Sequence, residues 1–376
     1  MNSLLDSLCD CSRRSTDSKL SFFCMLAGKD LNMTRIARTS HPNTQRTPIR
    51  FLTHKESMAA IGPYLSNFHS GFVGNEAFAQ NVFYLGGVPR LLTEFAKHVS
   101  NIPANDMTEN HLRNVRMAVL ANLQFPLLSF SDTLKLLAIS FTNTPVLKVL
   151  DIPFPNSRLA SKLTWSQMIS NGVCLLQDNG CVIVPFHFVA QVLDIQPSQF
   201  DELNEYEKAL VLSLKDLLEN VEVSIYSRPA WLTWESFGAR FYSIRINSFL
   251  VLGQDQVTIS SLLRGSRFLE GQFEAVVRLK IAKVIQSNEA YGPEMPRTIT
   301  PKGSYYSVDW IESEFVYVVL NCENGPGVDV FLILSRGDKS GYILLLDQRK
   351  RYSSNATNCV MSSINSRMPS WSSPPP

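Results

Sequence analysis

Apolar residues recur at helical spacing through the first half of this chain and at strand spacing in the last third. The segments LLTEFAKHV, NVRMAVLANL and SDTLKLLAIS repeat apolar positions every three or four residues, which predicts helices up to about residue 150. Before the first of them, Gly86 and Gly87 form a turn, and Pro89 suits the first turn of a helix. Nearer the amino terminus, the run SFFCMLA ends at Gly28 and predicts one buried strand.

The middle of the chain changes period within one segment, LTWSQMISNGVCLLQDNGCVIVPFHFVAQVL. A short helix is expected first, followed by two apolar strands around the turn Asp178-Asn179-Gly180, which is a β-hairpin signal. Helix followed by hairpin is the outline of a winged-helix unit. His187, within VPFHFV, reads as a packed strand residue, and the amphipathic segment EKALVLSLKDLLENV is expected to pack beside the unit.

The last third predicts an aromatic-rich helix, WLTWESFGARF, and then strands. Three strand-like runs are expected at Tyr305 to Asp309, at Phe315 to Leu320 and at 328 to 334, before a final run, YILLLDQRKR. The last 25 residues are rich in Ser, Asn and Pro and are expected to be disordered. The whole pattern indicates an α/β protein.

Composition narrows the possibilities only a little. A chain of 376 residues with 45% hydrophobic positions suggests two or three domains. Its net charge of +2 leaves any contact with a polyanion to local patches. Seven scattered cysteines without CxxC spacing indicate reduced thiols and no zinc site, and neither a signal peptide nor a membrane span is visible.

Candidate chemistry gathers at the final strands. Side chains alternate along a strand, so Gln348 and Lys350 are expected on one face of the last run, with Asp329 on the neighbouring strand. A carboxylate, an amide oxygen and a lysine two positions on suit a magnesium-dependent nuclease, because magnesium takes oxygen ligands and the lysine steadies charge on phosphate. Glu235, in WLTWESFGARF, is the candidate for a second carboxylate.

Plainer interpretations of the same residues stay open. An Asp at a strand start and a QRKR run at a strand end are also common where strands simply meet solvent. A shift of one residue would turn Asp347 and Arg349 inward and remove the lysine from the group. Trp165, Trp231 and Trp234 can stack on bases, but their apolar neighbours favour burial.

Five segments together resemble the Crinkler effectors of oomycetes and fungi and the retrotransposon hot spot proteins of trypanosomes. These segments are SFFCMLAGKDLNMTRI, FYLGGVPRLLTEF, the helix and hairpin from LTWSQMISNG, WESFGARFYSIRIN, and NCENGPGVDVFLIL with YILLLDQRKR. The resemblance implies an α/β multidomain chain made of a partial P-loop NTPase with a helical lid, a winged helix and a PD-(D/E)xK-type, restriction-endonuclease-like domain. The implied divisions are 1–60 for the NTPase remnant, 61–155 for the lid, 156–228 for the winged helix, 229–352 for the nuclease-like domain and 353–376 for a disordered tail.

The resemblance also assigns roles to individual residues. Asp329 becomes the strand acid, Gln348 the variable acid or glutamine, Lys350 the motif lysine and Glu235 the helix acid. Arg90 takes the place of a lid arginine that approaches the γ-phosphate, although a helix-start arginine in solvent is the simpler interpretation.

The chain departs from the family pattern in its first part. No GxxxxGK[ST] stretch occurs, so we expect no ATP hydrolysis, and the chain looks like the family pattern without its header and first NTPase half.

Two functions are compatible with this resemblance. The first is an effector fragment with a magnesium-dependent DNA nuclease domain. The second is a catalytically inactive module that binds nucleic acid or a host protein. By analogy with the family, the expected location is secreted and then the host nucleus.

Overall fold

A computed structural model describes most of the chain between residues 51 and 347. The described ranges are 51–66, 75–102, 108–122, 128–148, 150–157, 162–177, 179–227, 230–264, 274–292, 294–322, 325 and 328–347. The predicted strand near residues 20–27, the basic run from 349 to 351 and the predicted tail lie outside the described residues.

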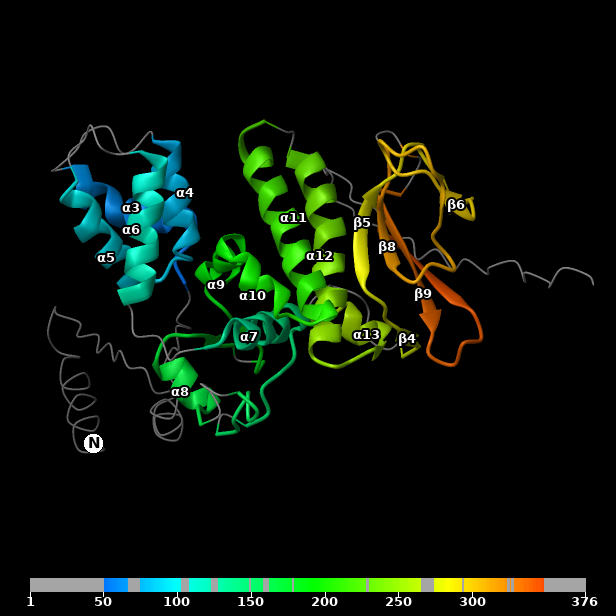
Figure 1. Cartoon of the computed structure of the whole chain (residues 1–376), viewed down its shortest axis with the longest axis horizontal. Coiled ribbons are helices and arrows are strands. Elements are labelled where there is room, and N and C mark those ends of the chain that lie inside the picture. Colours follow the sequence, from blue (N-terminus) through cyan, green and yellow to red (C-terminus); the bar gives the residue numbers. More distant parts are fainter. Residues whose placement is uncertain are drawn as a thin grey trace, which may run out of the picture.

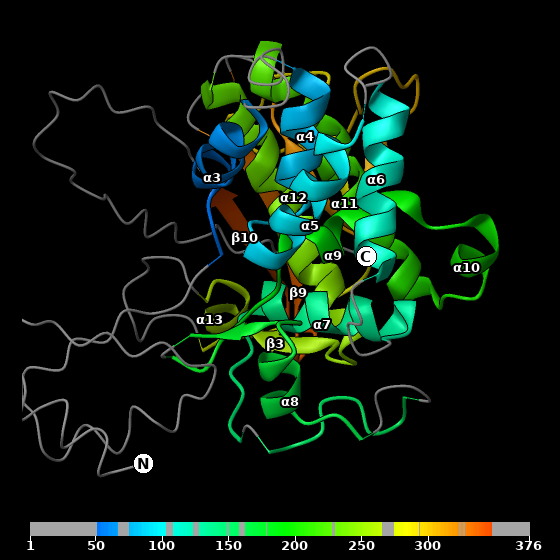
Figure 2. The ribbon, with the colours of Figure 1, turned by 90° about the vertical axis from the view of Figure 1, so that its left-hand side faces the viewer.

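In the first unit the structure describes four helices that lie together (Figure 1 and Figure 2). These helices share one apolar core. They are α3 (His54–Ser66), α4 (Glu76–Tyr84), α5 (Pro89–Ser100) and α6 (Glu109–Asn122). The predicted glycine turn is confirmed, since Gly86 and Gly87 have φ of 66° and 68° and Pro89 begins α5. Gly87 also accepts a 3.0 Å hydrogen bond from the N–H of Leu52, and a Cβ at Gly87 would lie 1.9 Å from the Leu52 carbonyl oxygen.

The second unit is helical with a small hairpin. Its elements are α7 (Phe130–Thr142), α8 (Trp165–Ser170), β1 (Leu175–Leu176), β2 (Val182–Ile183), α9 (Phe186–Ala190), the 3-10 helix η4 (Gln191–Asp194), α10 (Pro197–Asp201) and α11 (Glu205–Ser227). The predicted hairpin is confirmed, because β1 pairs antiparallel with β2, and an isolated bridge joins Pro145 to Cys181 beside it. Trp165 is buried in the shared core, as its apolar neighbours indicated.

The expected domain limits can be compared with the elements. Residues 60 and 61 both lie within α3, whose Ile61 is part of the core of the first unit. Helix α7, which precedes residue 155, shares its core with α8, the hairpin and α11 rather than with α5 and α6.

His187 is fully buried but does not lie in a strand, so that part of its prediction was wrong. Pro185 ends the strand run, because its fixed φ and missing N–H suit the start of a helix better than a ladder. His187 is therefore the second residue of α9, and its backbone approaches Gly86 so closely that a Cβ there would lie 2.9 Å from the His187 nitrogen.

The third unit is one long helix, α12 (Ala230–Val251), on a six-stranded sheet. Its remaining elements are β3 (Gln256–Thr258), α13 (Ile259–Leu262), β4 (Val276–Arg278), β5 (Ala282–Gln286), β6 (Thr298–Ile299), β7 (Val308–Asp309), β8 (Val316–Leu320), β9 (Val330–Arg336) and β10 (Tyr342–Asp347). The strand order is β3-β4-β9-β8-β5, and β10 pairs with β9. Only β5 and β8 run parallel among these pairs.

The strand predictions for this unit are largely confirmed. The runs ending at Leu320 and Leu334 and the final run form β8, β9 and β10. The run from Tyr305 is shorter than expected, since only Val308–Asp309 forms β7, while Tyr305 and Tyr306 are 99% and 81% exposed. Strands β4 and β5 come from QFEAVVRLKIAKVIQ, for which the sequence pattern alone had not indicated strands.

The two faces of the sheet carry different apolar clusters. One cluster packs α12 against residues such as Val318, Val330 and Leu332. The other packs Val319 and Phe331 against Trp310, whose indole N–H donates to the Pro296 carbonyl at 2.8 Å. Figure 1 shows α12 standing between α11 and the sheet.

A buried amide attaches α12 to the sheet. The Asn247 side chain accepts from the Ala282 N–H at 2.8 Å and donates to the Ala282 carbonyl at 3.0 Å, as a neighbouring strand would. The chain is thus a mixed α/β protein with several separate cores. No described helix is long and apolar enough to cross a membrane.

Candidate functional site at one edge of the sheet

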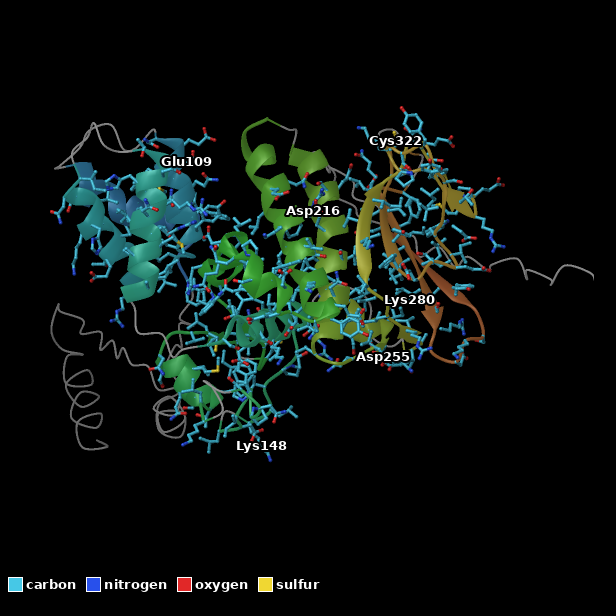
Figure 3. All side chains as sticks on the ribbon, viewed as in Figure 1. Glu109, Lys148, Asp216, Asp255, Lys280 and Cys322 are labelled. Atoms are coloured by element: carbon cyan, nitrogen blue, oxygen red, sulfur yellow. The ribbon has the colours of Figure 1, made fainter. Side chains whose placement is uncertain are left out.

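Four strands each have one end in the same row, at the end of the sheet where the candidate residues lie. Register pairs Gln286 with Leu320, Leu320 with Val330, and Val330 with Asp347. Cys322, which follows β8, marks this end in Figure 3, whereas Lys280, which precedes β5, marks the opposite end. The carboxyl ends of β5, β8 and β10 therefore meet the start of β9.

The main chain of Asp329 is held from both sides in this row. Its N–H donates to the Asp347 carbonyl at 3.0 Å, and its own carbonyl accepts from the Asn321 N–H at 2.8 Å. Because Asp347 pairs in register with Val330, two residues of the β9 chain lie opposite one residue of β10, as in a β-bulge.

Side-chain burial supports this break in the alternation. Val328 belongs to the cluster around Trp310, whereas Val330 belongs to the cluster under α12. Residues two apart in a regular strand share a face, so the alternation is interrupted at Asp329. Because of this interruption, the side chain of the half-buried Asp329 does not follow the face alternation of the strand after it.

Asn321 fixes the loop that leads to Asp329. Its side-chain NH2 donates to the carbonyls of Tyr291 and Val328, both at 2.8 Å, and its side-chain oxygen accepts from the Tyr291 N–H at 2.9 Å. A Cβ at Gly325 would lie 2.1 Å from the Asn321 side-chain nitrogen. A larger residue at position 325 would therefore displace the Asn321 amide from these bonds.

Asp347 faces α12. Its carboxylate accepts a 3.3 Å hydrogen bond from the hydroxyl of Tyr242, and Ile343 and Leu345, which alternate with it, pack in the cluster under α12. Glu235 precedes Tyr242 by seven residues, about two turns or 10 Å of helix, so both residues lie on the same side of α12. Glu235 is half-buried.

The predicted site residues are thus only partly placed. Asp329 and Glu235 are described, the first at the sheet edge and the second on the helix over the sheet, but Gln348 and Lys350 lie outside the described residues. Among the described residues, no group of three or more His, Cys, Asp or Glu side chains could hold a metal ion. The magnesium site expected from the sequence also includes the amide of Gln348.

Arg90 lies elsewhere, in the first unit. It is the second residue of α5 and is exposed, as expected for an arginine at a solvated helix start.

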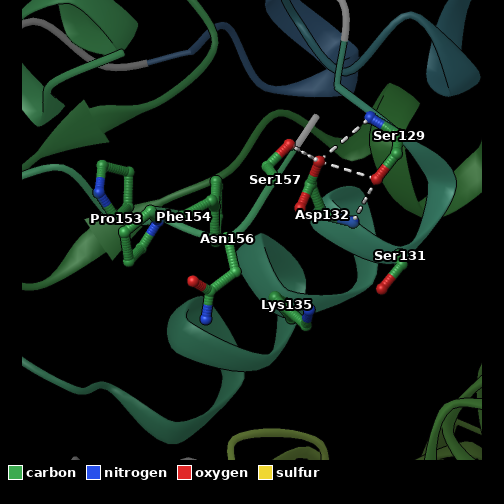
Figure 4. Close-up of a pocket in the computed structure, with 9 residues that line it drawn as sticks. Ser129, Ser131, Asp132, Lys135, Pro153, Phe154, Asn156 and Ser157 are labelled. Carbon is green, nitrogen blue, oxygen red and sulfur yellow. Dashed lines mark hydrogen bonds between the residues drawn. The ribbon is translucent and has the colours of Figure 1, made fainter. Parts of the chain in front are cut away.

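A pocket of about 590 Å³ lies away from the sheet, at the start of α7 (Figure 4). Asp132 on its wall is buried and accepts from the hydroxyls of Ser129 and Ser157, at 2.6 Å and 2.5 Å. The Asp132 N–H donates to the Ser129 hydroxyl at 3.1 Å and the Ser129 N–H donates to the Asp132 carboxylate at 3.3 Å, so the two residues form a capping box. The carboxylate in this pocket therefore stabilises the helix start.

The sequence pattern missed Tyr242 and Asn321. Asn321 carries a weak signal, because it ends an apolar strand before a glycine-rich loop. Tyr242 carries none, since nothing in an aromatic-rich helix marks which tyrosine will reach an acid more than a hundred residues away.

Comparison with known proteins adds no assignment. No family model matches this chain, and neither a curated protein nor a solved structure is significantly similar to it.

Proposed function

We propose that α12 and the C-terminal sheet form a magnesium-dependent DNA nuclease domain of a Crinkler-like effector. The observation that carries the proposal is the position of Asp329. Its main chain is locked against Asp347, the last residue of β10, and Gln348 and Lys350 follow directly in sequence. Asp329 thus lies beside the last described residue of β10, directly before the glutamine-x-lysine run in the sequence.

The proposed roles follow from the chemistry of each group. Asp329 and Gln348 would supply a carboxylate and an amide oxygen to the ion, and Glu235 would add a second carboxylate from α12. A bound magnesium ion polarises the phosphate and lowers the pKa of water. Lys350 would hold the attacking water and balance charge on the phosphate. The interruption at Asp329 supports the proposal, since bulges frequently re-aim side chains next to active sites.

The test is plasmid nicking with magnesium and then with EDTA. Wild type is compared with Asp329→Asn, Lys350→Ala and Glu235→Gln. The control variants are Asp338→Asn and Lys339→Ala, which make the same charge changes in the β9–β10 turn at the other end of the hairpin. Wild type and both controls should nick, and Asp329→Asn and Lys350→Ala should lose at least about a hundredfold in rate.

The same variants also distinguish a nuclease from an inactive module that only binds DNA. Equal nicking by all variants, or nicking that survives EDTA, would show a contaminating nuclease and rule the site out. A wild-type protein that binds DNA in a salt-dependent gel shift, keeps that binding in Asp329→Asn and never nicks would instead be a binding module.

A further inference from the structure

Strand β10 has one free edge among the described strands. Its whole length, from Tyr342 to Asp347, pairs with β9, and no described strand pairs with its other side. Its sequence is YILLLD, so it carries no charge before its last residue and no proline. Natural edge strands usually carry such features to prevent pairing with another chain, and β10 lacks them.

The pairing with β9 determines which backbone groups of β10 point outward. The Arg336 N–H donates to the Gly341 carbonyl at 2.8 Å, so Arg336 and Gly341 form a hydrogen-bonded pair. Such pairs recur at every second residue, so the odd-numbered residues of β10 are the ones that bond to β9. The N–H and C=O groups of Tyr342, Leu344 and Leu346 therefore point away from β9. Tyr342 and Leu346 also have large side chains that are 42% and 43% exposed.

We infer that β10 is a dimerisation edge, and that it pairs antiparallel with β10 of a second copy of this chain. With a two-fold axis through Leu344, the outward N–H and C=O groups of Tyr342 lie opposite those of Leu346 in the second copy. Those of Leu346 likewise lie opposite Tyr342 of the second copy. Leu344 then faces its own counterpart. The sheet continues across the axis, as in isologous dimers.

A second copy fits this edge for reasons of chemistry and charge. The Tyr342 side chain of each copy lies opposite the Leu346 side chain of the other, on the same face of the sheet. An aromatic and an aliphatic side chain form a favourable cross-strand pair, and the two-fold axis makes two such pairs. In this register Asp347 lies opposite Gly341 of the other copy, so the one acid of the strand avoids its counterpart. A strand of another protein would need a matching apolar pattern, whereas β10 already matches itself.

The first experiment is sedimentation velocity on the full chain from about 1 to 100 µM. We expect a species of twice the 42.3 kDa chain mass at the upper concentrations. Leu344→Pro removes an N–H that points away from β9, so it should leave the fold intact by circular dichroism. It should raise the dimer dissociation constant on the order of tenfold or more, because both copies lose a hydrogen bond.

A charge exchange tests the register itself. Tyr342→Lys alone and Leu346→Glu alone should each weaken the dimer, and the double variant should restore it, because lysine then faces glutamate across the axis. Tyr305→Lys, on an exposed loop elsewhere in the unit, should leave the dimer unchanged. A monomer at all concentrations, or a dimer indifferent to these β10 variants, would overturn the inference, and a dimer that the double variant fails to restore would overturn the register.

Discussion

The hydroxyl of Tyr242 in α12 donates a hydrogen bond to the carboxylate of Asp347 at the end of β10, 105 positions later in the chain, at 3.3 Å. This bond ties the helix that carries Glu235 to the strand end from which Gln348 and Lys350 follow. The helix and the strand end are therefore positioned together.

Tyr242→Phe should weaken that attachment. Both groups are half-buried, so loss of one hydrogen bond should lower the free energy of unfolding by about 0.5 to 1.5 kcal/mol, measured by urea denaturation. Tyr305→Phe removes a hydroxyl that is almost fully exposed and should change nothing. Equal stability of the two variants would mean that the bond contributes nothing to the fold.

Gly325→Ala should destabilise the entry to β9. The new Cβ would lie 2.1 Å from the Asn321 side-chain nitrogen and would displace an amide that bonds to the backbone of both Tyr291 and Val328. We expect a loss of about 2 to 3 kcal/mol. Gly62→Ala, where nothing beyond the neighbouring residues lies within 4 Å of the added Cβ, meets only the ring of Pro63 and should cost less than Gly325→Ala. Thermal melts of both variants provide the measurement.

Acid should destabilise the fold through His187. Burial lowers the pKa of His187 from 6.5 to about 3, so below pH 6.5 the unfolded state binds a proton that the folded state does not. This contribution to stability is complete above pH 6.5 and is lost as the pH falls toward 3. Between pH 6.5 and 5 the loss is about 2 kcal/mol, at roughly 1.4 kcal/mol per pH unit.

Urea unfolding at several pH values checks this slope. In His187→Phe the free energy of unfolding should fall by about 2 kcal/mol less than in wild type between pH 6.5 and 5. His98→Phe, at an exposed position of α5, should keep the wild-type slope. A His187→Phe protein with an unchanged slope would show that the proton is taken up elsewhere.

Asp194→Asn should loosen the contact between the first two units. Asp194 forms ion pairs with Arg113 and Arg116, and the Arg116 side chain is only 4% exposed. Removing the acid leaves a buried cation over the Tyr84 ring without its carboxylate, at a cost of about 3 kcal/mol or more. Glu94→Gln breaks an exposed pair with Lys97 and should cost less than about 1 kcal/mol. Limited proteolysis between α6 and α7, with denaturation curves, would reveal the difference.

Local patterns alone were sufficient for many elements of this protein. Pro89 and the glycines before it predicted the start of α5, the Asn-Gly turn predicted the β1–β2 hairpin, and apolar runs predicted β8, β9 and β10. Each of these depends on backbone preferences and burial within a few neighbouring residues. The sequence itself therefore determined them.

Tertiary structure decided the rest, because it depends on contacts between distant segments. The run containing Ala282 became a strand next to β8, with its first residue bonded by Asn247 of α12. The alternation of faces is interrupted at Asp329, where the N–H donates to the Asp347 carbonyl and the carbonyl accepts from the Asn321 N–H. Periodicity assigns a residue to a face only while the ladder is regular, and it contains no information about which distant groups will interrupt it.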